Sequence, residues 1–256
     1  MIKVIAVGDL HADFARLWRA LKNSFAVGED LMPTDPLVRG TYRVVLMGDL
    51  VHPKLLADYR KLTGLEDYDP ANPDHLRMAA RAQIRELHRI KRFQEAAPEH
   101  ITILMGNHDH AAITGAFVLG NAHLEHKEFH PELGGIVFPE DLKAWFSTFP
   151  NEVNIHGVNF AHVGPVPWLQ SYDEMFYAGR EAKEWWMENA DYVERMGHRF
   201  GVYGHTVMKN GILVKDKLAL IDALDHDQYL ELILDDDKLD WEIVQIPPVR
   251  AMSGGQ

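Results

Sequence analysis

The sequence predicts an α/β fold, in which buried parallel strands alternate with helices and antiparallel hairpins follow. Apolar runs that end in Gly and one polar residue supply the strands, and they recur at residues 4–9, 44–49, 101–107 and 200–205. Continuous apolar runs of this length are typical of strands that are covered on both faces. Helical patterns lie between the first three runs, which is the order of crossover connections.

The first helical segment spans residues 13–26 and the second spans residues 75–97. In the first segment apolar side chains recur at helical spacing, at Phe14, Leu17, Trp18 and Leu21. The second segment is long, charged and rich in Ala. Both are therefore expected to form the helices that connect neighbouring strands.

The second half of the chain has a different pattern. Residues 152–164, 211–223 and 228–246 contain pairs of apolar runs separated by polar turns, which is typical of hairpins. We therefore expect antiparallel strands to follow the parallel units.

A single domain is expected over residues 1–246, with insertions at about 53–99 and 165–199. The first insertion begins with a stretch rich in Pro, Asp and Asn, and the second contains the aromatic segment AKEWWMENADYV. Both are expected to border a cleft rather than to form separate domains. The tail, residues 247–256, is expected to be disordered.

The composition excludes several classes of function. The chain has 256 residues, no Cys, and 26 Lys and Arg against 38 Asp and Glu, which gives a net charge of −12. Disulfides, thiol nucleophiles and cysteine-ligated metal centres are excluded. The negative charge argues against a stable complex with nucleic acid, and no apolar stretch is long enough for a membrane span. We expect a cytoplasmic protein with no membrane partner, and the sequence predicts no oligomeric state.

Polar side chains follow the buried strands at the point where each strand ends. The four runs deliver Asp9, Asp49, Asn107 and His205, and His11 lies two positions beyond Asp9. Ligands of open α/β sheets bind at the carboxyl ends of such strands. Asp, Asn and His supply the oxygen and nitrogen donors that suit Mn, Fe and Zn. Asp49 could bridge two ions, which could then activate water for hydrolysis of a phosphoester.

Five short motifs carry a resemblance to a known family. They are G-D-L-H (8–11), G-D-L-V (48–51), G-N-H-D (106–109), A-H-V-G-P (161–165) and G-H-T (204–206). In this order they resemble the calcineurin-like metallophosphoesterase superfamily, and the resemblance spans residue 4 to about residue 223. The later features are most similar to the phosphoprotein phosphatase and symmetrical diadenosine-tetraphosphatase branch.

The resemblance implies a four-layer α/β/β/α sandwich with mixed sheets and a dimetal centre. By position, the first metal would be held by Asp9, His11 and Asp49, and the second by Asp49, Asn107, His162 and His205. His108 would protonate the leaving group, and Asp109 would hold the His108 ring. A carboxylate partner fixes the tautomer of an imidazole and favours its protonated form, as a general acid requires.

The expected activity is hydrolysis of phosphomonoesters by a hydroxide that bridges two divalent cations, with protein phosphoserine or phosphothreonine among the substrates. Mn is the first expectation for the metal, with Fe, Zn and Co as alternatives. The alternative activity is hydrolysis of a phosphodiester or of a dinucleoside polyphosphate. The expected substrate partner is a phosphorylated small molecule, a nucleotide or a phosphoprotein. The alternative of another kind is a scaffold that binds metal without catalysis.

Two departures from the family pattern concern the substrate. Val207 stands where many members have a further His, and the segment GDLVHPK lacks the Arg that binds phosphate in the phosphatase branch. Lys54 lies one residue beyond the place of that Arg. We therefore expect Lys54, or Arg180 and Arg199 from the second insertion, to bind the substrate phosphate.

Other residues have a structural interpretation beside a functional one. His123, His126 and His130 have the spacing of a helix face, and a solvated charged face is favoured over an extra metal site. His52, His110 and His156 adjoin the motifs and are candidates for the cleft wall. Asp222 is equally consistent with a turn and with a place near the centre. Trp185 and Trp186 are expected to pack rather than to stack on a base.

Overall fold

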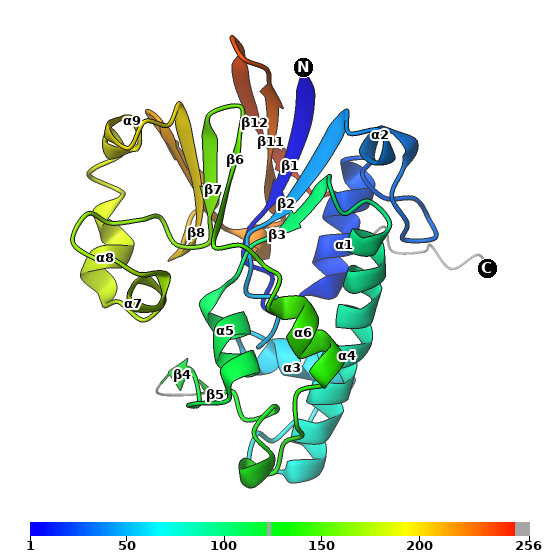
Figure 1. The fold of residues 1–256 in the computed structure, drawn as a ribbon. Helices are drawn as coiled ribbons and strands as arrows, with labels where there is room; N and C mark the ends of the chain where they lie inside the picture. The colour runs from blue at the N-terminus through cyan, green and yellow to red at the C-terminus, as the bar shows by residue number, and fades with distance from the viewer. Residues whose placement is uncertain (122–123, 249–256) are drawn as a thin grey trace.

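The structure, a computed structural model, describes residues 1–121 and 124–248. Two mixed five-stranded sheets pack face to face, and helices cover their outer faces (Figure 1). The first sheet has the order β12-β11-β1-β2-β3, and the second has the order β6-β7-β8-β10-β9. The predicted α/β/β/α sandwich is therefore confirmed.

The first half contains β1 (Ile2–Val7), α1 (Phe14–Asn23), α2 (Asp35–Val38), β2 (Tyr42–Leu46), α3 (Leu56–Thr63), α4 (Pro73–Glu95), β3 (Ile101–Ile103), α5 (Asn107–Thr114), β4 (Gly120–Asn121), β5 (Leu124–Glu125), η1 (Pro131–Leu133) and α6 (Glu140–Phe146). The second half contains β6 (Glu152–Ile155), β7 (Val158–Ala161), α7 (Tyr172–Phe176), α8 (Arg180–Trp185), α9 (Tyr192–Arg195), β8 (Phe200–Val207), β9 (Leu213–Lys215), β10 (Leu218–Asp222), η2 (Leu224–His226), β11 (Gln228–Leu234) and β12 (Leu239–Gln245).

The apolar runs of the first sheet are continuous because both of its faces are buried. Ile5 and Val7 of β1 face α1 and α4, in a core that includes Leu17 and Ile90. Val4 and Ala6 face the second sheet, in a core with residues such as Phe160 and Val202. Helices α8 and α9 contact β8 and form the outer layer on the other side (Figure 1).

The strands of the first sheet are shorter than their apolar runs. Strand β2 ends at Leu46 and β3 ends at Ile103, so the predicted strands 44–49 and 101–107 are corrected at their ends. The last residues of each run leave the sheet to form the loops beyond it, and Asn107 already begins α5. Both predicted helices are confirmed, as α1 with Asp13 as N-cap and as α4 with Asn72 as N-cap.

All three predicted hairpins are confirmed. They are the antiparallel pairs β6–β7, β9–β10 and β11–β12. Strand β8 is parallel to both β7 and β10, which makes the second sheet mixed. The tail predicted over residues 247–256 lies, from residue 249 onward, outside the described residues. No helix in the described part is long and apolar enough to cross a membrane.

Candidate metal centre

Seven of the predicted residues converge at one edge of the sheets. In the first sheet the parallel strands are aligned, with Val7 opposite Leu46 and Leu46 opposite Ile103, so their carboxyl ends open on the same side. The converging residues follow these strands, follow β7 or lie in β8: Asp9, His11, Asp49, Asn107, His108, His162 and His205. All but His162 line a cleft of about 500 Å³.

Glycines allow the loops to approach each other at this edge. A Cβ on Gly106 would lie 2.2 Å from Asp49 Oδ1, and a Cβ on Gly204 would lie 2.2 Å from Asp9 Oδ1. Asp49 itself has a φ of 50° and His205 has a φ of 60°. Both angles fall in the left-handed region, which residues other than glycine rarely adopt. The backbone is therefore strained at Asp49 and His205, the positions where these side chains line the cleft.

Asp49 lies at the centre of the cluster. Its Oδ2 is 3.5 Å from His11 Nε2 and 3.5 Å from His162 Nε2. Its Oδ1 accepts a hydrogen bond of 2.8 Å from the backbone N–H of His108. The carboxylate is thus oriented by the first turn of α5, with one oxygen between imidazoles from two different sheets.

Asn107, His162 and His205 form the other side of the cluster. Asn107 Oδ1 lies 3.0 Å from His162 Nε2 and 2.9 Å from His205 Nδ1. His162 Nδ1 donates to the carbonyl oxygen of Met47 at 2.7 Å, which leaves His162 Nε2 available as a ligand atom. Two ring nitrogens and one amide oxygen that face each other in this way form a donor set for a cation.

The donor set fits divalent cations. Ligand atoms lie within 4.8 Å of one another in three groups, which are His11, Asp49 and His108; Asp49, His162 and His205; and Asp9, His11 and Asp222. Asp9 Oδ1 and His205 Nε2 are buried and have no hydrogen-bond partner in the described residues. Buried polar atoms normally have a partner, and a cation would supply one here.

The electrostatics of the cluster also suit a cation. Burial raises the pKa of Asp9 to about 6, opposed by His162 and reinforced by Asp49. Burial likewise raises the pKa of Asp49. Burial lowers the pKa values of His11 and His205, which keeps both rings in the neutral form that binds metal. Packed carboxylates with raised pKa values gain most from a nearby positive charge.

The structure does not place Asp109 against the His108 ring, so that part of the prediction is corrected. Asp109 Oδ1 accepts from the backbone N–H of Leu50 at 2.7 Å, and its Oδ2 accepts from Gly106 N–H at 3.2 Å. Asp109 occupies the first turn of α5, where its side chain caps the helix and joins two loops. The atom beside His108 Nδ1 is His52 Nδ1, at 3.0 Å.

Lys54, which the sequence predicts to bind the substrate phosphate, lines the cleft. Its Nζ donates to Asp222 Oδ1 at 2.5 Å, and Asp222 is almost fully buried. Burial lowers the pKa of Lys54, but the charges of Asp222 and Asp9 outweigh it and raise the value overall. Burial raises the pKa of Asp222 to about 7. Of the two interpretations of Asp222, the structure supports a place near the centre.

The two predicted arginines, Arg180 and Arg199, are not among the residues that line the cleft. Arg180 pairs with Glu184 on the exposed side of α8, and Arg199 donates to backbone carbonyls such as that of Asp235 at 2.7 Å. Lys183, from the same insertion, lines the cleft and makes no ion pair within the described part of the chain. No signal in the sequence distinguishes Lys183 from the other charged residues of α8, so the sequence does not predict its place in the cleft.

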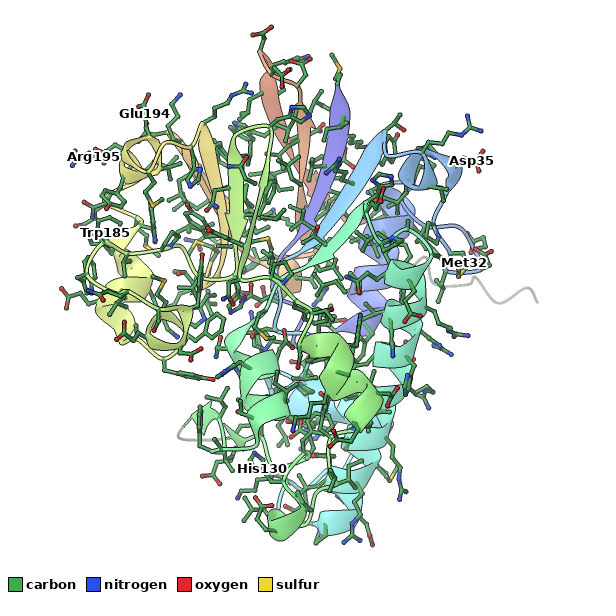
Figure 2. All side chains as sticks on the ribbon, in the orientation of Figure 1. Met32, Asp35, His130, Trp185, Glu194 and Arg195 are labelled. Carbon is green, nitrogen blue, oxygen red and sulfur yellow. The ribbon has the colours of Figure 1, made fainter. Side chains whose placement is uncertain are left out.

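The histidine cluster at residues 123–130 is not a solvated helix face. His123 lies outside the described residues, but His126 and His130 are 4% and 5% exposed. Residues 124–130 form β5 and a loop, so helical spacing does not apply to His126 and His130. One nitrogen of each ring has a partner: Tyr59 Oη lies 2.9 Å from His126 Nδ1, and Glu132 Oε1 lies 3.0 Å from His130 Nδ1. Figure 2 places His130 at the end of the molecule away from the sheets.

The remaining candidates separate clearly. His52 is buried beside His108, while His110 contacts Tyr177 of the cleft wall at 2.7 Å. His156 pairs with the exposed Asp236. The predicted packing of the tryptophan pair is confirmed, because Trp186 is buried against Tyr203 and Trp185 lies on the outer layer (Figure 2).

The fold and the donor cluster together define a metal-binding protein of the two-sheet α/β type. The calcineurin-like phosphoesterase family matches residues 2–244 of the chain. The chain therefore belongs to the calcineurin-like phosphoesterase family, whose members are metal-dependent hydrolases of phosphoester bonds. No curated protein matches the chain in sequence.

Solved structures share the fold at low identity. A cold-active protein-tyrosine phosphatase of a psychrophilic Shewanella species is 14% identical, with a TM-score of 0.58 over 96% of this chain and 81% of that chain. A protein serine/threonine phosphatase from Saccharomyces cerevisiae is 11% identical, with a TM-score of 0.55 over 96% and 81%. A metallophosphoesterase from Sphaerobacter thermophilus is 14% identical, with a TM-score of 0.51 over 96% and 90%.

Proposed function

We propose that the protein hydrolyses phosphomonoesters with two divalent cations, Mn being the first candidate. The observation that supports this is the buried donor cluster, in which Asp9 Oδ1 and His205 Nε2 have no partner among the described residues. One cation would be held by Asp9, His11 and Asp49, and the other by Asp49, Asn107, His162 and His205. Cations bound there would polarise the phosphoryl oxygens and lower the pKa of the attacking water.

The protein's own side chains would do the remaining work. His108 lines the cleft and would give a proton to the leaving oxygen. Lys54 and Lys183 also line the cleft, and they would balance the charge of the phosphate. Arg180 and Arg199 lie outside this set of lining residues, so Lys183 replaces them in the proposal.

A monoester dianion suits a cleft with two lysines beside a metal centre. The Shewanella and yeast neighbours are described as protein phosphatases, which supports phosphoprotein among the substrates. Lys183 supports the preference for a monoester, because no ion pair among the described residues competes for its ammonium group in the cleft.

A second hollow favours the alternative substrate class. It has a volume of about 400 Å³ and shares Asp9, His11, Lys54 and Val207 with the cleft. Apolar side chains such as Leu55 and Leu224 line it, whereas His108 lines only the cleft. A diester or dinucleoside polyphosphate would place its leaving group in the cleft and its second substituent in this hollow.

The test compares nitrophenyl phosphate with bis-nitrophenyl phosphate, using chelator-stripped protein before and after addition of Mn²⁺. We expect Mn²⁺-dependent turnover with a clear preference for the monoester. Preference for the diester would select the second candidate. Protein that binds Mn²⁺ and turns over neither compound would contradict both and leave a metal-binding scaffold.

A further inference from the structure

Among the described residues, His108 Nδ1 has one ring nitrogen as a hydrogen-bond partner, and this is Nδ1 of His52. His52 lies in the loop beyond β2, is 2% exposed, and places its Nδ1 3.0 Å from that of His108. Both atoms are ring nitrogens, so one of them carries the proton of this hydrogen bond and the other accepts it. In either arrangement Nδ1 of His108 is engaged, and Nε2 is the nitrogen left for a substrate.

The backbone of His52 is fixed from two sides. Its N–H donates to Gln83 Oε1 at 2.9 Å, and its carbonyl oxygen lies 3.1 Å from His11 Nδ1. Its φ of 67° is strained for a residue with a side chain. A strained backbone that is held by partners from α4 and from the β1 loop indicates a residue whose position matters.

A buried polar layer packs against the His52 ring. His126 stacks on it with ring centroids 4.7 Å apart and an angle of 6° between the rings. Tyr59 Oη lies 2.9 Å from His126 Nδ1 and donates to Glu128 Oε1 at 2.7 Å. Gln83 Nε2 donates to the same oxygen at 2.9 Å, which closes the layer back onto His52.

We infer that His52 is a positioning residue for His108: its Nδ1 engages Nδ1 of His108 and orients that ring with Nε2 toward the substrate. The inference rests on the proposed function, because it assigns to His52 a role in the same reaction. It also explains why the segment with His126 and Glu128 is buried, since these side chains form the layer on which the His52 ring rests. Asp109 takes no part in it, because both of its oxygens accept backbone N–H groups.

The test uses two variants of nearly equal shape. His52→Asn keeps a hydrogen-bonding group close to the place of Nδ1, whereas His52→Leu removes it. Each variant is assayed with nitrophenyl phosphate, which has a good leaving group, and with phenyl phosphate, which needs an acid. Metal content is measured in parallel, so that loss of the metal centre is recognised separately. His130→Asn is the control for a buried histidine outside the layer.

We expect His52→Leu to lose on the order of 10²-fold in kcat on phenyl phosphate, as for a misplaced catalytic group, and much less on nitrophenyl phosphate. His52→Asn should recover most of the difference, and His52→Leu should add nothing further in a His108→Ala background. Equal losses on both substrates, or a full further loss in that background, would overturn the inference. Wild-type protein without turnover would instead overturn the proposed function, and the role of His52 with it.

Discussion

At the scale of single residues, the candidate centre depends most on Asp49. Its Oδ2 lies between imidazoles from both sheets, and its Oδ1 is held by the first turn of α5. A carboxylate can bind two cations at once and its negative charge offsets part of theirs, whereas an amide oxygen carries no net charge.

Asp49→Asn should therefore abolish metal-dependent turnover and reduce bound metal to at most half of the wild-type content. Asn has nearly the same shape as Asp, so the expected loss of metal would result from the loss of the negative charge. Metal analysis after dialysis and a turnover assay would check this. Asp35→Asn in the first turn of α2, where the side chain is 86% exposed, is the control. Wild-type metal content in Asp49→Asn would contradict the assignment.

Lys183→Ala should raise KM for a phosphomonoester about tenfold, the effect of one lost charge-assisted contact of roughly 1.4 kcal/mol. Arg180→Ala on the same helix is the matched control, since its partner is Glu184. Steady-state kinetics on both variants would measure the effect. A raised KM in Arg180→Ala with none in Lys183→Ala would reverse the assignment of the phosphate-binding cation.

At the scale of elements, the junction between β3 and α5 places the most side chains. Gly106 is the N-cap of α5, and Asp109 accepts its backbone N–H. The next two residues, Asn107 and His108, therefore enter the cleft from one helical turn. The short β3 makes this possible, because the chain leaves the sheet early enough to begin a helix at the cleft.

Gly106→Ala should lower the free energy of unfolding by about 1–3 kcal/mol, the usual cost of an overpacked site, and should reduce metal binding. The added Cβ would lie 2.2 Å from Asp49 Oδ1 and 2.3 Å from its backbone nitrogen. Denaturant unfolding would measure the change. Gly179→Ala is the control, because no atom of the described residues beyond its chain neighbours lies within 4 Å of the Cβ position. Equal stability of both variants would show that the Gly106 loop can move aside.

At the scale of the whole molecule, the two sheets meet over one apolar core and bring their loops to a common edge. The edge concentrates the buried carboxylates of Asp9, Asp49 and Asp222, whose pKa values burial raises. Such a cluster opposes folding unless positive charge joins it. Lys54 supplies one such charge, through its contact with Asp222.

Divalent metal should consequently stabilise the whole fold. At a free Mn²⁺ concentration of 100 times its Kd, one site adds about 2.7 kcal/mol to the free energy of unfolding. Thermal unfolding of chelator-stripped protein should occur at a lower temperature than that of the Mn²⁺-loaded protein, and chelator-stripped protein in NaCl of equal ionic strength is the control. An unchanged midpoint would mean that the cluster does not bind Mn²⁺ in the folded state.

The sequence by itself determined the order of the elements and the side chains that gather at the sheet edge. Each of these side chains lies within a few residues of an apolar strand run, so local patterns place it. Asp9 and His11 follow β1 and Asn107 opens α5 in this way. Strand ends were less predictable, because the apolar runs continue into buried loops.

Only the tertiary structure decided which side chains support the cluster. His52 and His108, at 3.0 Å, are 56 positions apart, and Lys54 and Asp222, at 2.5 Å, are 168 apart. Lys183 reaches the cleft while Arg180, three residues earlier, faces solvent. Such contacts depend on how separate loops and short helices pack against one another, and no local spacing encodes that geometry. The physical reason is that a hydrogen bond is formed by distance and direction in space, which the fold of the whole chain sets.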